Sequence, residues 1–218
     1  MPEENPRNKS SLIPTLVTVI VIALVAGGGY YAWKTFMQSA PEPEPTPVVE
    51  TPPVPQTSQY ASSTMRFSLS YPIDFTLQEP YAYTRVSASK PINGVKFAVP
   101  LALTQGTNLA PDSGISVEQL PRASRCSADI YLLANVRATS MTEGATTYSV
   151  ATSSETKEGE TYDEVVYAYP SSSPCIAVRY FMHTTAASTS TTPFNRALVL
   201  AAFEEIRRSV VVQPAAAN

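Results

Sequence analysis

The stretch that decides the fold covers residues 146–184 and reads TTYSVATSSETKEGETYDEVVYAYPSSSPCIAVRYFMHT. It contains three segments rich in β-branched and aromatic residues, at 146–155, 161–169 and 175–184. The turn-forming residues 157–160 and 171–174 separate them, and such boundaries are typical of strands. Connections this short join antiparallel neighbours, because parallel strands need a longer crossover. The stretch therefore predicts an antiparallel meander of three strands.

The last of these strands indicates where the core lies. Successive side chains of a strand point to opposite faces of the sheet. One face carries only apolar side chains and is expected to pack on the main core: Ile176, Val178, Tyr180 and Met182. The other face is mixed in character: Cys175, Ala177, Arg179, Phe181 and His183.

Period-two alternation upstream of the meander predicts further strands. In the first of them, which Pro72 ends, the apolar positions are Met65, Phe67, Leu69 and Tyr71. Other strands are expected at 81–88, 95–99 and 115–120. The dipeptide Asn93-Gly94 predicts a tight hairpin turn before 95–99, because both residues accept a positive φ.

Two helices are expected. The clearer one covers 193–208, where Thr192 can cap the helix and Pro193 suits its first position. Its apolar stripe consists of Leu198, Val199, Ala202, Phe203 and Ile206. A short helix is expected at 127–134, with Ser124 or Ser127 as its cap. The fold class is therefore α+β: a mainly antiparallel sheet with a C-terminal helix packed on it.

The N-terminal segment 12–33 is expected to cross a membrane as a helix. Residues 12–32 contain no charged side chain and would span roughly 32 Å as a helix, enough for a hydrocarbon core of about 30 Å. A cleaved signal peptide is the alternative, with an apolar region at 12–25 and small residues at Ala26 and Gly28. The apolar stretch continues past that cleavage site, which favours an uncleaved anchor.

The charges around this segment predict its orientation. Arg7 and Lys9 precede it, whereas Lys34 alone follows before a run of acidic residues. Positive residues stay on the cytoplasmic side. Residues 1–11 are therefore expected in the cytoplasm, and everything after Lys34 outside it in a single-pass arrangement.

A proline-rich stalk is expected at 38–64. Its centre, PEPEPTPVVETPPVP, holds seven prolines in fifteen residues and cannot bury enough apolar surface to fold. Prolines bias such a chain to extended polyproline II, which suits a semi-rigid spacer. An α+β domain at 65–210 and a flexible tail at 211–218 complete the predicted organisation.

Composition excludes several classes of function. The 218 residues include 15 Lys and Arg against 18 Asp and Glu, so no basic surface for nucleic acid is expected. One histidine and two cysteines are too few for most metal sites, and no phosphate-binding loop is present. No metal or other cofactor is therefore expected. Cys126 and Cys175 lie in the domain placed outside the cytoplasm, where a disulfide between them is expected.

His183 is the one candidate general base with an ordinary pKa near neutrality. No Gly-x-Ser-x-Gly motif marks a serine partner for it. The neighbours Asp163 and Glu164 point to opposite faces of a strand and cannot share a substrate atom. The acidic pair Glu158 and Glu160 is interpreted as a solvated turn, and Asp112 as part of a plain turn.

Tyrosine pairs are the other candidate site residues. Tyr81 and Tyr83 share one strand face, and Tyr167 and Tyr169 share another. Tyrosines at this spacing can stack on sugars or peptides, with Arg179 and His183 as neighbouring polar contacts. The alternative is that the tyrosines cover the core beneath the C-terminal helix.

The segment FSLSYP at 67–72, followed by Phe75, resembles the opening strand of PsbP-like domains. The hairpins after it and a last helix that ends near Arg208-Ser209 are similar to the α/β/α sandwich of that family. The segments 174–180 and 202–208 resemble membrane-anchored proteins of candidate-phyla, Parcubacteria-like bacteria. Those resemblances imply a bacterial chain with an anchor, a stalk and a domain, and they bring no assigned activity or metal-site residues.

The sequence thus leads to a membrane-anchored extracytoplasmic binding or structural module whose ligand is unknown. Its partners would be the membrane and an envelope polymer or protein, and not nucleic acid. The alternative is an anchored cell-envelope hydrolase that uses His183, so the sequence does not decide whether the chain is an enzyme. A signal transducer is disfavoured, because about eleven cytoplasmic residues cannot form a domain.

Overall fold

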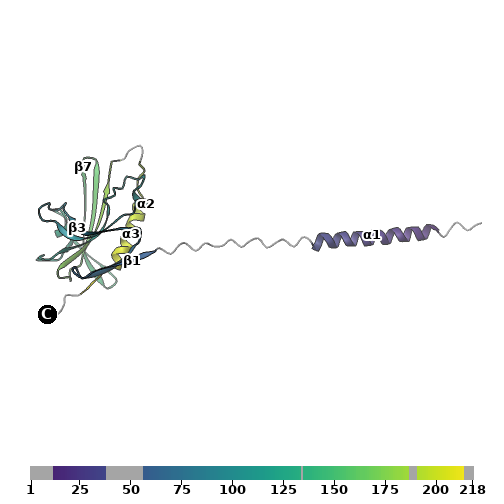
Figure 1. Cartoon of the computed structure of the whole chain (residues 1–218), viewed down its shortest axis with the longest axis horizontal. Helices are drawn as coiled ribbons and strands as arrows, with labels where there is room; N and C mark the ends of the chain where they lie inside the picture. The colour runs from purple at the N-terminus through teal and green to yellow at the C-terminus, as the bar shows by residue number, and fades with distance from the viewer. Residues whose placement is uncertain (1–11, 38–55, 134, 187–190, 214–218) are drawn as a thin grey trace, which may run out of the picture. The chain divides into compact units, whose positions relative to one another are not determined.

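The computed structural model of the chain describes residues 12–37, 56–133, 135–186 and 191–213. The chain divides after Pro53 into a unit that contains the helix α1 and a unit that contains the folded domain (Figure 1). The predictions for residues 1–11 and 214–218, for 38–55 of the stalk and for 187–190 lie outside the described residues.

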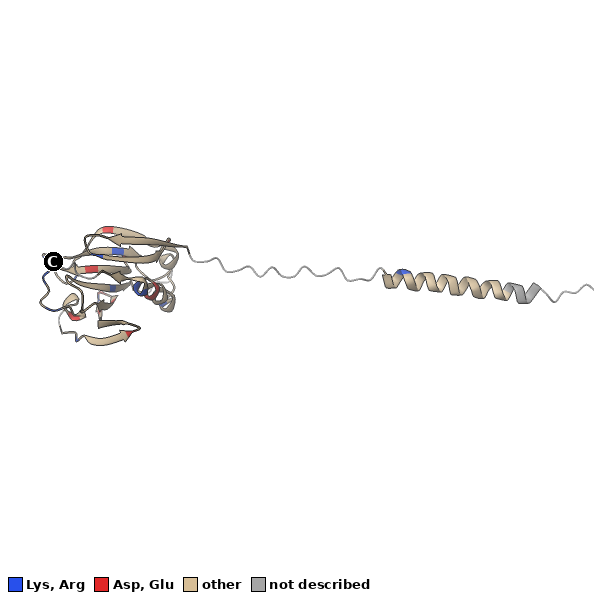
Figure 2. Cartoon of the chain, turned by 90° about the horizontal axis from the view of Figure 1, so that it is seen from below, with Lys and Arg blue, Asp and Glu red and all other residues tan. Residues whose placement is uncertain are grey.

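Helix α1 covers Leu12–Met37 and extends four residues beyond the predicted 12–33. Its part from Val17 to Met37 is long and apolar enough to cross a membrane, a property that a signal sequence near the N-terminus shares. The side chains of this part are exposed, so it is not the core helix of a soluble domain. Lys34 is the one charged residue of α1 (Figure 2).

The domain is α+β with antiparallel sheets, as predicted. In chain order its elements are β1 (Thr57–Ser62), β2 (Phe67–Pro72), β3 (Thr76–Tyr83), β4 (Ile92–Ala98), α2 (Leu101–Thr104), β5 (Gly114–Leu120), the short helix η1 (Ala128–Tyr131), β6 (Thr139–Glu143), β7 (Thr146–Lys157), β8 (Glu160–Ala168), β9 (Cys175–Thr184), α3 (Arg196–Ser209) and β10 (Val211–Val212). One sheet has the order β1-β2-β10 and the other β3-β4-β5-β9-β8-β7-β6.

The meander predicted from residues 146–184 is confirmed. Strand β8 lies between β7 and β9 and pairs with both in antiparallel register. A two-residue turn joins β7 to β8, where Glu158 and Gly159 both have a positive φ, at 56° and 85°. Two such residues match the right-handed twist of the flanking strands, which fixes the register of this hairpin.

Two apolar clusters lie on the two faces of the large sheet. The face of β9 predicted to meet the main core does so, together with β2 and α3. The other face of β9 contributes Cys175, Ala177 and Phe181 to a second cluster, which η1 and the loops around it cover. The division of β9 into two faces is therefore confirmed, and both faces are largely buried.

The hairpin turn predicted at Asn93-Gly94 is wrong. Both residues lie inside β4, where Gly94 pairs with Tyr81 on one side and Glu118 on the other. A Cβ atom at Gly94 would stand 2.4 Å from the carbonyl oxygen of Val117. Glycine is therefore needed here because the two strands approach closely. The Asn-Gly dipeptide alone does not distinguish such a strand position from a turn.

Both predicted helices exist with different ends. Helix α3 begins at Arg196, because the side chain of Asn195 accepts a hydrogen bond from the Leu198 N–H at 3.1 Å; Thr192 is not the cap. In its stripe Leu198 is exposed, and Arg207 is buried instead. The predicted helix at 127–134 is only the four-residue 3-10 turn η1, which starts after Ser127 without a side-chain cap.

The domain is longer than predicted at both ends. Strand β1 lies within the segment expected to be stalk, and β10 lies within the expected flexible tail, yet both pair with β2. The strand predicted from Met65 starts at Phe67, because Arg66 has a positive φ of 57°. The strand predicted at 81–88 is β3 and ends at Tyr83. The sequence pattern does not predict α2 and β6.

The disulfide between Cys126 and Cys175 is confirmed. It joins the loop that precedes η1 to the first residue of β9. The bridge closes a separation of 49 residues, and such a constraint stabilises a fold by roughly 4 kcal/mol in the chain-entropy account. It thus holds the loop that covers the second face of the large sheet.

Candidate functional site

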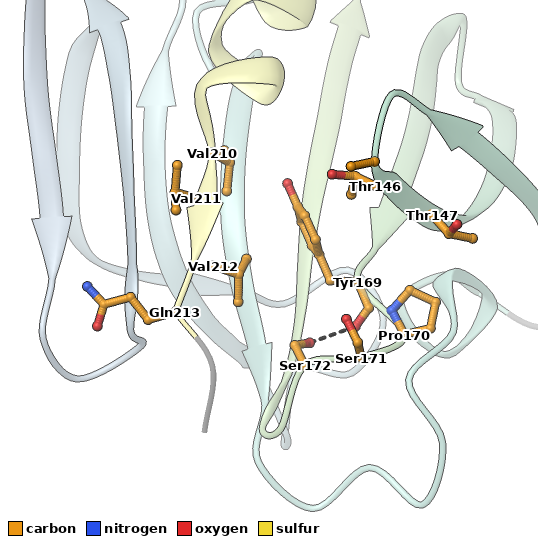
Figure 3. Close-up of a pocket in the computed structure, with 11 residues that line it drawn as sticks. Thr146, Thr147, Tyr169, Pro170, Ser171, Ser172, Val210, Val211, Val212 and Gln213 are labelled. Carbon is orange, nitrogen blue, oxygen red and sulfur yellow. Dashed lines mark hydrogen bonds between the residues drawn. The ribbon is translucent and has the colours of Figure 1, made fainter. Parts of the chain in front are cut away.

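A groove lies between β10 and the connections at one end of the large sheet, and its volume is about 710 Å³. Residues 210–213, which lead from α3 through β10, form one side (Figure 3). The other side consists of residues 145–147 at the β6–β7 turn and 169–172 at the β8–β9 connection. A volume of this size is typical of ligand-binding pockets, which span roughly 300–1,000 Å³.

Local hydrogen bonds hold the groove in shape. The Ser172 hydroxyl donates to the Tyr169 carbonyl at 2.7 Å and accepts from the Ile176 N–H at 2.9 Å. On the opposite side the Val210 N–H donates to the Arg207 carbonyl at 3.1 Å, so the chain leaves α3 directly into β10. Both sides are therefore fixed by the elements that precede them.

The residues that line the groove carry no charge. Their side chains are apolar, hydroxyl-bearing or amide-bearing: Ala145, Thr146, Thr147, Tyr169, Pro170, Ser171, Ser172, Val210, Val211, Val212 and Gln213. Burying an ionised ligand group without a partner charge is costly. The groove consequently suits a neutral ligand with hydrogen-bonding groups rather than a phosphate, a carboxylate or a cation.

Tyr169 supplies an unused polar group in this groove. The residue is only 6% exposed, and its hydroxyl has no hydrogen-bond partner among the described residues. Burial raises the pKa of Tyr169, and the nearby Tyr148 adds to this, although their hydroxyls do not meet hydrogen-bond geometry. A buried donor without a partner costs stability, so the Tyr169 hydroxyl is an unsatisfied group next to the groove.

A buried ion cluster lies on the other face of the large sheet. The guanidinium of Arg179, which has no exposed surface, donates two hydrogen bonds of 2.8 Å to Glu118 and further ones to Glu164 and the Tyr131 carbonyl. It also lies 3.7 Å from the ring centroid of Tyr83. Every direction around Arg179 is thus occupied by the protein itself.

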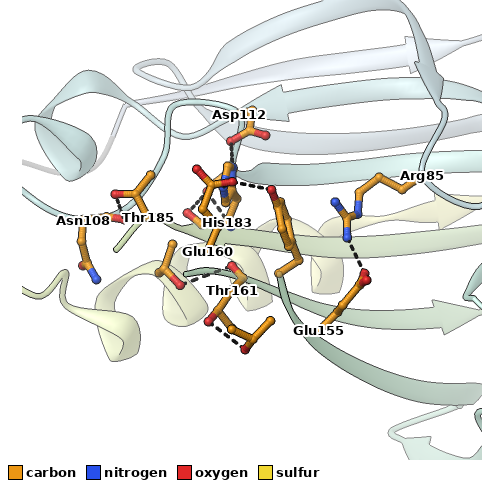
Figure 4. Close-up of polar contacts among 12 residues, drawn as sticks. Arg85, Asn108, Asp112, Glu155, Glu160, Thr161, His183 and Thr185 are labelled. Atoms are coloured by element: carbon orange, nitrogen blue, oxygen red, sulfur yellow. Dashed lines mark hydrogen bonds and ion pairs between the residues drawn. The ribbon is translucent and has the colours of Figure 1, made fainter. Parts of the chain in front are cut away.

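His183 lies at the edge of that face, between two carboxylates (Figure 4). Its Nδ1 is 2.8 Å from Asp112 and its Nε2 is 3.2 Å from Glu160, and its ring stacks on Tyr162 at 4.3 Å. Tyr162 in turn donates to Glu160 at 2.6 Å, and this hydrogen bond is the main reason why the pKa of Glu160 is lowered.

Among the described residues, the neighbours of the His183 ring nitrogens are acids and not a serine hydroxyl. A Ser-His-Asp triad needs an imidazole nitrogen bonded to the serine hydroxyl, with the other nitrogen held by the acid. Here both nitrogens face acids. The hydroxyl of Ser113 is bonded instead to the main chain of His183, accepting from its N–H at 3.0 Å.

The structure does not bring the six predicted ligand-contact residues together. Tyr81, Tyr83, Arg179 and His183 lie on the face of the ion cluster, whereas Tyr167 and Tyr169 belong to the main core beneath α3. Of the six, only Tyr169 lines the groove. Their contact with a ligand stays a prediction. No group of three His, Cys, Asp or Glu residues in the described part of the chain has the arrangement of a metal site.

Sequence reasoning missed most of the groove. The predicted organisation places residues 210–213 at the domain end and in a flexible tail, although three successive valines at 210–212 are typical of a strand. The sequence pattern predicts Thr146 and Thr147 as strand residues and gives no sign that they belong to a site. Their role depends on β10, a neighbour that no local pattern places beside them.

The sequence matches no protein-family model and no curated protein at a significant level. Two solved structures are similar in fold. One is a solution structure of cyanobacterial PsbP (CyanoP) from Synechocystis sp. PCC 6803, with 12% identity and a TM-score of 0.42, covering 79% of this chain and 100% of that one. The other is a crystal structure of a protein from Bacteroides thetaiotaomicron VPI-5482, with 13% identity and a TM-score of 0.40.

The likeness to the Bacteroides protein covers 74% of this chain, which spans about half the length of that protein. The chain is thus similar to a PsbP structure at low identity, and no role or site of either protein is transferred. The resemblance to candidate-phyla proteins stays a prediction.

Proposed function

We propose that the chain is a membrane-anchored, extracytoplasmic binding module whose domain holds a neutral ligand in the groove beside β10. The observation that carries this proposal is the groove itself: a volume of about 710 Å³, an uncharged lining and a buried Tyr169 hydroxyl without a partner among the described residues. Ligand sites typically combine an apolar lining with a few polar groups of this kind.

Three features support the anchored, extracytoplasmic part of the proposal. Helix α1 is apolar and long enough to span a bilayer. Arg7 and Lys9 precede it, which favours a cytoplasmic N-terminus. The Cys126–Cys175 disulfide is typical of domains in an oxidising compartment. The proline-rich sequence after α1 would then act as a spacer between membrane and domain.

The test measures binding by the full chain in detergent micelles to two neutral probes. The probes are a phage-displayed library of heptapeptides built from uncharged residues, and the fully N-acetylated form of chitotetraose, an uncharged oligosaccharide that is called chitotetraose below. Ser171→Arg should block the groove, because Ser171 is an exposed lining residue and arginine adds both bulk and charge. Ser124→Arg, an exposed change outside the groove lining, is the matched control.

The expected result is binding of at least one probe that Ser171→Arg abolishes and Ser124→Arg leaves unchanged. Binding that survives Ser171→Arg would place the ligand elsewhere. If neither probe binds, the proposal of a neutral ligand in this groove fails.

A further inference from the structure

We infer that the ligand of the groove is an extended, uncharged peptide segment of another protein, which pairs with the free edge of β10. The inference rests on the proposed function and names its ligand class. A peptide that adds a strand to a sheet edge gains affinity from main-chain hydrogen bonds and specificity from alternate side chains.

The register of β10 shows which of its main-chain groups are free for such pairing. Val211 and Val212 lie opposite Ser68 and Phe67, and the Gln213 N–H donates to the Arg66 carbonyl at 2.8 Å. Hydrogen-bonded and non-hydrogen-bonded pairs alternate along antiparallel strands. Gln213 and Val211 therefore turn their main-chain groups toward β2, and Val212 turns its N–H and C=O to the opposite side.

That opposite side is the groove. Strand β10 is the last strand of the order β1-β2-β10, so no strand of that sheet pairs with its second edge among the described residues. Val212 lines the groove, and Tyr169 and Pro170 stand on the other side of it (Figure 3). An unpaired edge with a volume beside it is a ready template for another strand.

The residues that line the groove also indicate which side chains the bound peptide should carry. A peptide main chain presents alternating N–H and C=O groups and no charge. Its carbonyl can accept from the Val212 N–H, and its N–H can donate to the Val212 carbonyl. The uncharged lining disfavours acidic or basic side chains that point into the groove. Small neutral residues at alternate positions fit best.

An oligosaccharide is the competing neutral ligand, and the main-chain groups argue against it. The Val212 N–H and C=O match the C=O and N–H that one residue of a paired strand presents, whereas sugar sites usually rely on exposed aromatic faces for stacking. In this groove the one aromatic residue, Tyr169, is 6% exposed.

The test uses a heptapeptide selected from the phage library on the full chain in detergent micelles. Each amide of the synthetic peptide is methylated in turn, which removes one main-chain donor at a time. Of the two residues of β10, only Val212 turns its main chain to the groove. Strand pairing therefore predicts a loss of about tenfold in affinity at the one peptide amide that donates to the Val212 carbonyl and small losses at the neighbouring amides, because one lost buried hydrogen bond has roughly that effect.

Two variants of the protein supply a second measurement. Val212→Pro removes the N–H that faces the groove, a change that edge strands accept, and should weaken binding about tenfold. Ser124→Arg, an exposed change outside the groove lining, is the control, and its affinity should stay within about threefold of the original. Thermal unfolding checks that both variants fold; the methylation scan needs no variant and decides the question if Val212→Pro does not fold.

Three outcomes would overturn the inference, and they differ from failure of the proposed function. A methylation scan in which no single amide stands out from its neighbours would exclude strand pairing. Chitotetraose bound in a Ser171-dependent manner, with no peptide selected, would keep the groove as a site and remove the peptide. A variant that lacks residues 214–218 supplies a further comparison. If this variant binds the peptide and the full chain does not, the occupant of the groove is the chain's own residues 214–218. If neither probe binds at all, the proposed function fails as well.

Discussion

Arg179 shows how a single charge can be held inside this domain. The mixed face of β9 would be expected to tolerate water, but the structure buries Arg179 completely between Glu118, Glu164 and the ring of Tyr83. The hydrogen bonds of the Arg179–Glu118 pair are bidentate, the arrangement that best offsets the desolvation of both charges. The cluster therefore serves the fold rather than a ligand.

Glu118→Gln should destabilise the domain by about 3 kcal/mol, because it leaves a buried guanidinium with too little compensating charge. The matched control is Glu155→Gln, which removes an exposed partner of Arg85 and should cost about 1 kcal/mol or less. Urea unfolding monitored by circular dichroism measures both. Equal effects of the two substitutions would contradict a structural role for the buried cluster.

Gly94 is a second residue whose role is steric. Gly94→Ala places a Cβ atom against the main chain of β5 and should destabilise the domain by about 1–3 kcal/mol. The neighbouring Asn93 is exposed, so Asn93→Ala should change stability by less than about 0.5 kcal/mol. The close approach of β4 and β5 leaves no room for the added Cβ atom. An unchanged unfolding midpoint for Gly94→Ala would therefore contradict it.

At the scale of elements, ion pairs tie α3 to the large sheet. Glu143 at the end of β6 contacts Arg207 at 2.5 Å and Arg208 at 2.8 Å, and Asp163 of β8 contacts Arg196 at 2.6 Å. The hydrogen bond from Arg207 lowers the pKa of Glu143. For Asp163, burial alone would raise the pKa, but hydrogen bonds from Ser154 and Arg196 outweigh it and lower the pKa.

These shifts predict that acid weakens the docking of α3. A carboxyl whose folded pKa is lowered stabilises the fold above its ordinary pKa, here 4.5 for Glu143 and 3.8 for Asp163. That contribution is lost as the pH falls through the folded pKa values below these, since the unfolded chain binds more protons there. The unfolding free energy should therefore fall between about pH 5 and about pH 3.

The double variant Glu143→Gln, Asp163→Asn should be less stable than the original near pH 6 and should lose less stability on acidification. The curves of unfolding free energy against pH should approach each other at low pH. Protonation there neutralises the two carboxylates of the original protein, and the substitutions have already replaced them in the variant. Glu205→Gln, an exposed change on α3, is the control and should keep the original slope. Parallel curves for the double variant and the original would contradict this account.

At the scale of the whole molecule, the chain is predicted to stay in the membrane fraction after an alkaline wash and to lose that property when residues 12–37 are deleted. The physical reason is the burial of an uninterrupted apolar span, in which Lys34 alone is charged. Protease added to intact bacterial cells should digest the domain and spare an epitope placed at the N-terminus.

The control for this experiment is the same digestion after lysis, which should remove the epitope too. The mass of the purified chain separates anchor from signal peptide, because an anchor leaves Met1 or Pro2 as the first residue. A soluble chain that starts near Gly29 would contradict the anchor, and a protected domain would contradict the orientation.

Much of the domain followed from local pattern. The meander of β7, β8 and β9, the two faces of β9 and the position of α3 are each set by residues close in sequence, through period-two alternation and a helical stripe. The disulfide followed from the count of cysteines and the predicted compartment. The Asn93-Gly94 error has the same origin, since glycine serves both turns and close strand contacts, and the dipeptide carries no information about its neighbours in space.

By itself the sequence determined the apolar N-terminal helix, the α+β class and the core strands, because hydrophobic periodicity is a local property that burial then acts on. Only the tertiary structure decided that β1 and β10 close a second sheet around β2, that Arg179 is buried among Glu118 and Glu164, and that β10 faces Thr146 and Tyr169 across a groove. These features depend on pairing between segments as far apart as β2 and β10. A main-chain hydrogen bond leaves no signature in the side chains that it joins.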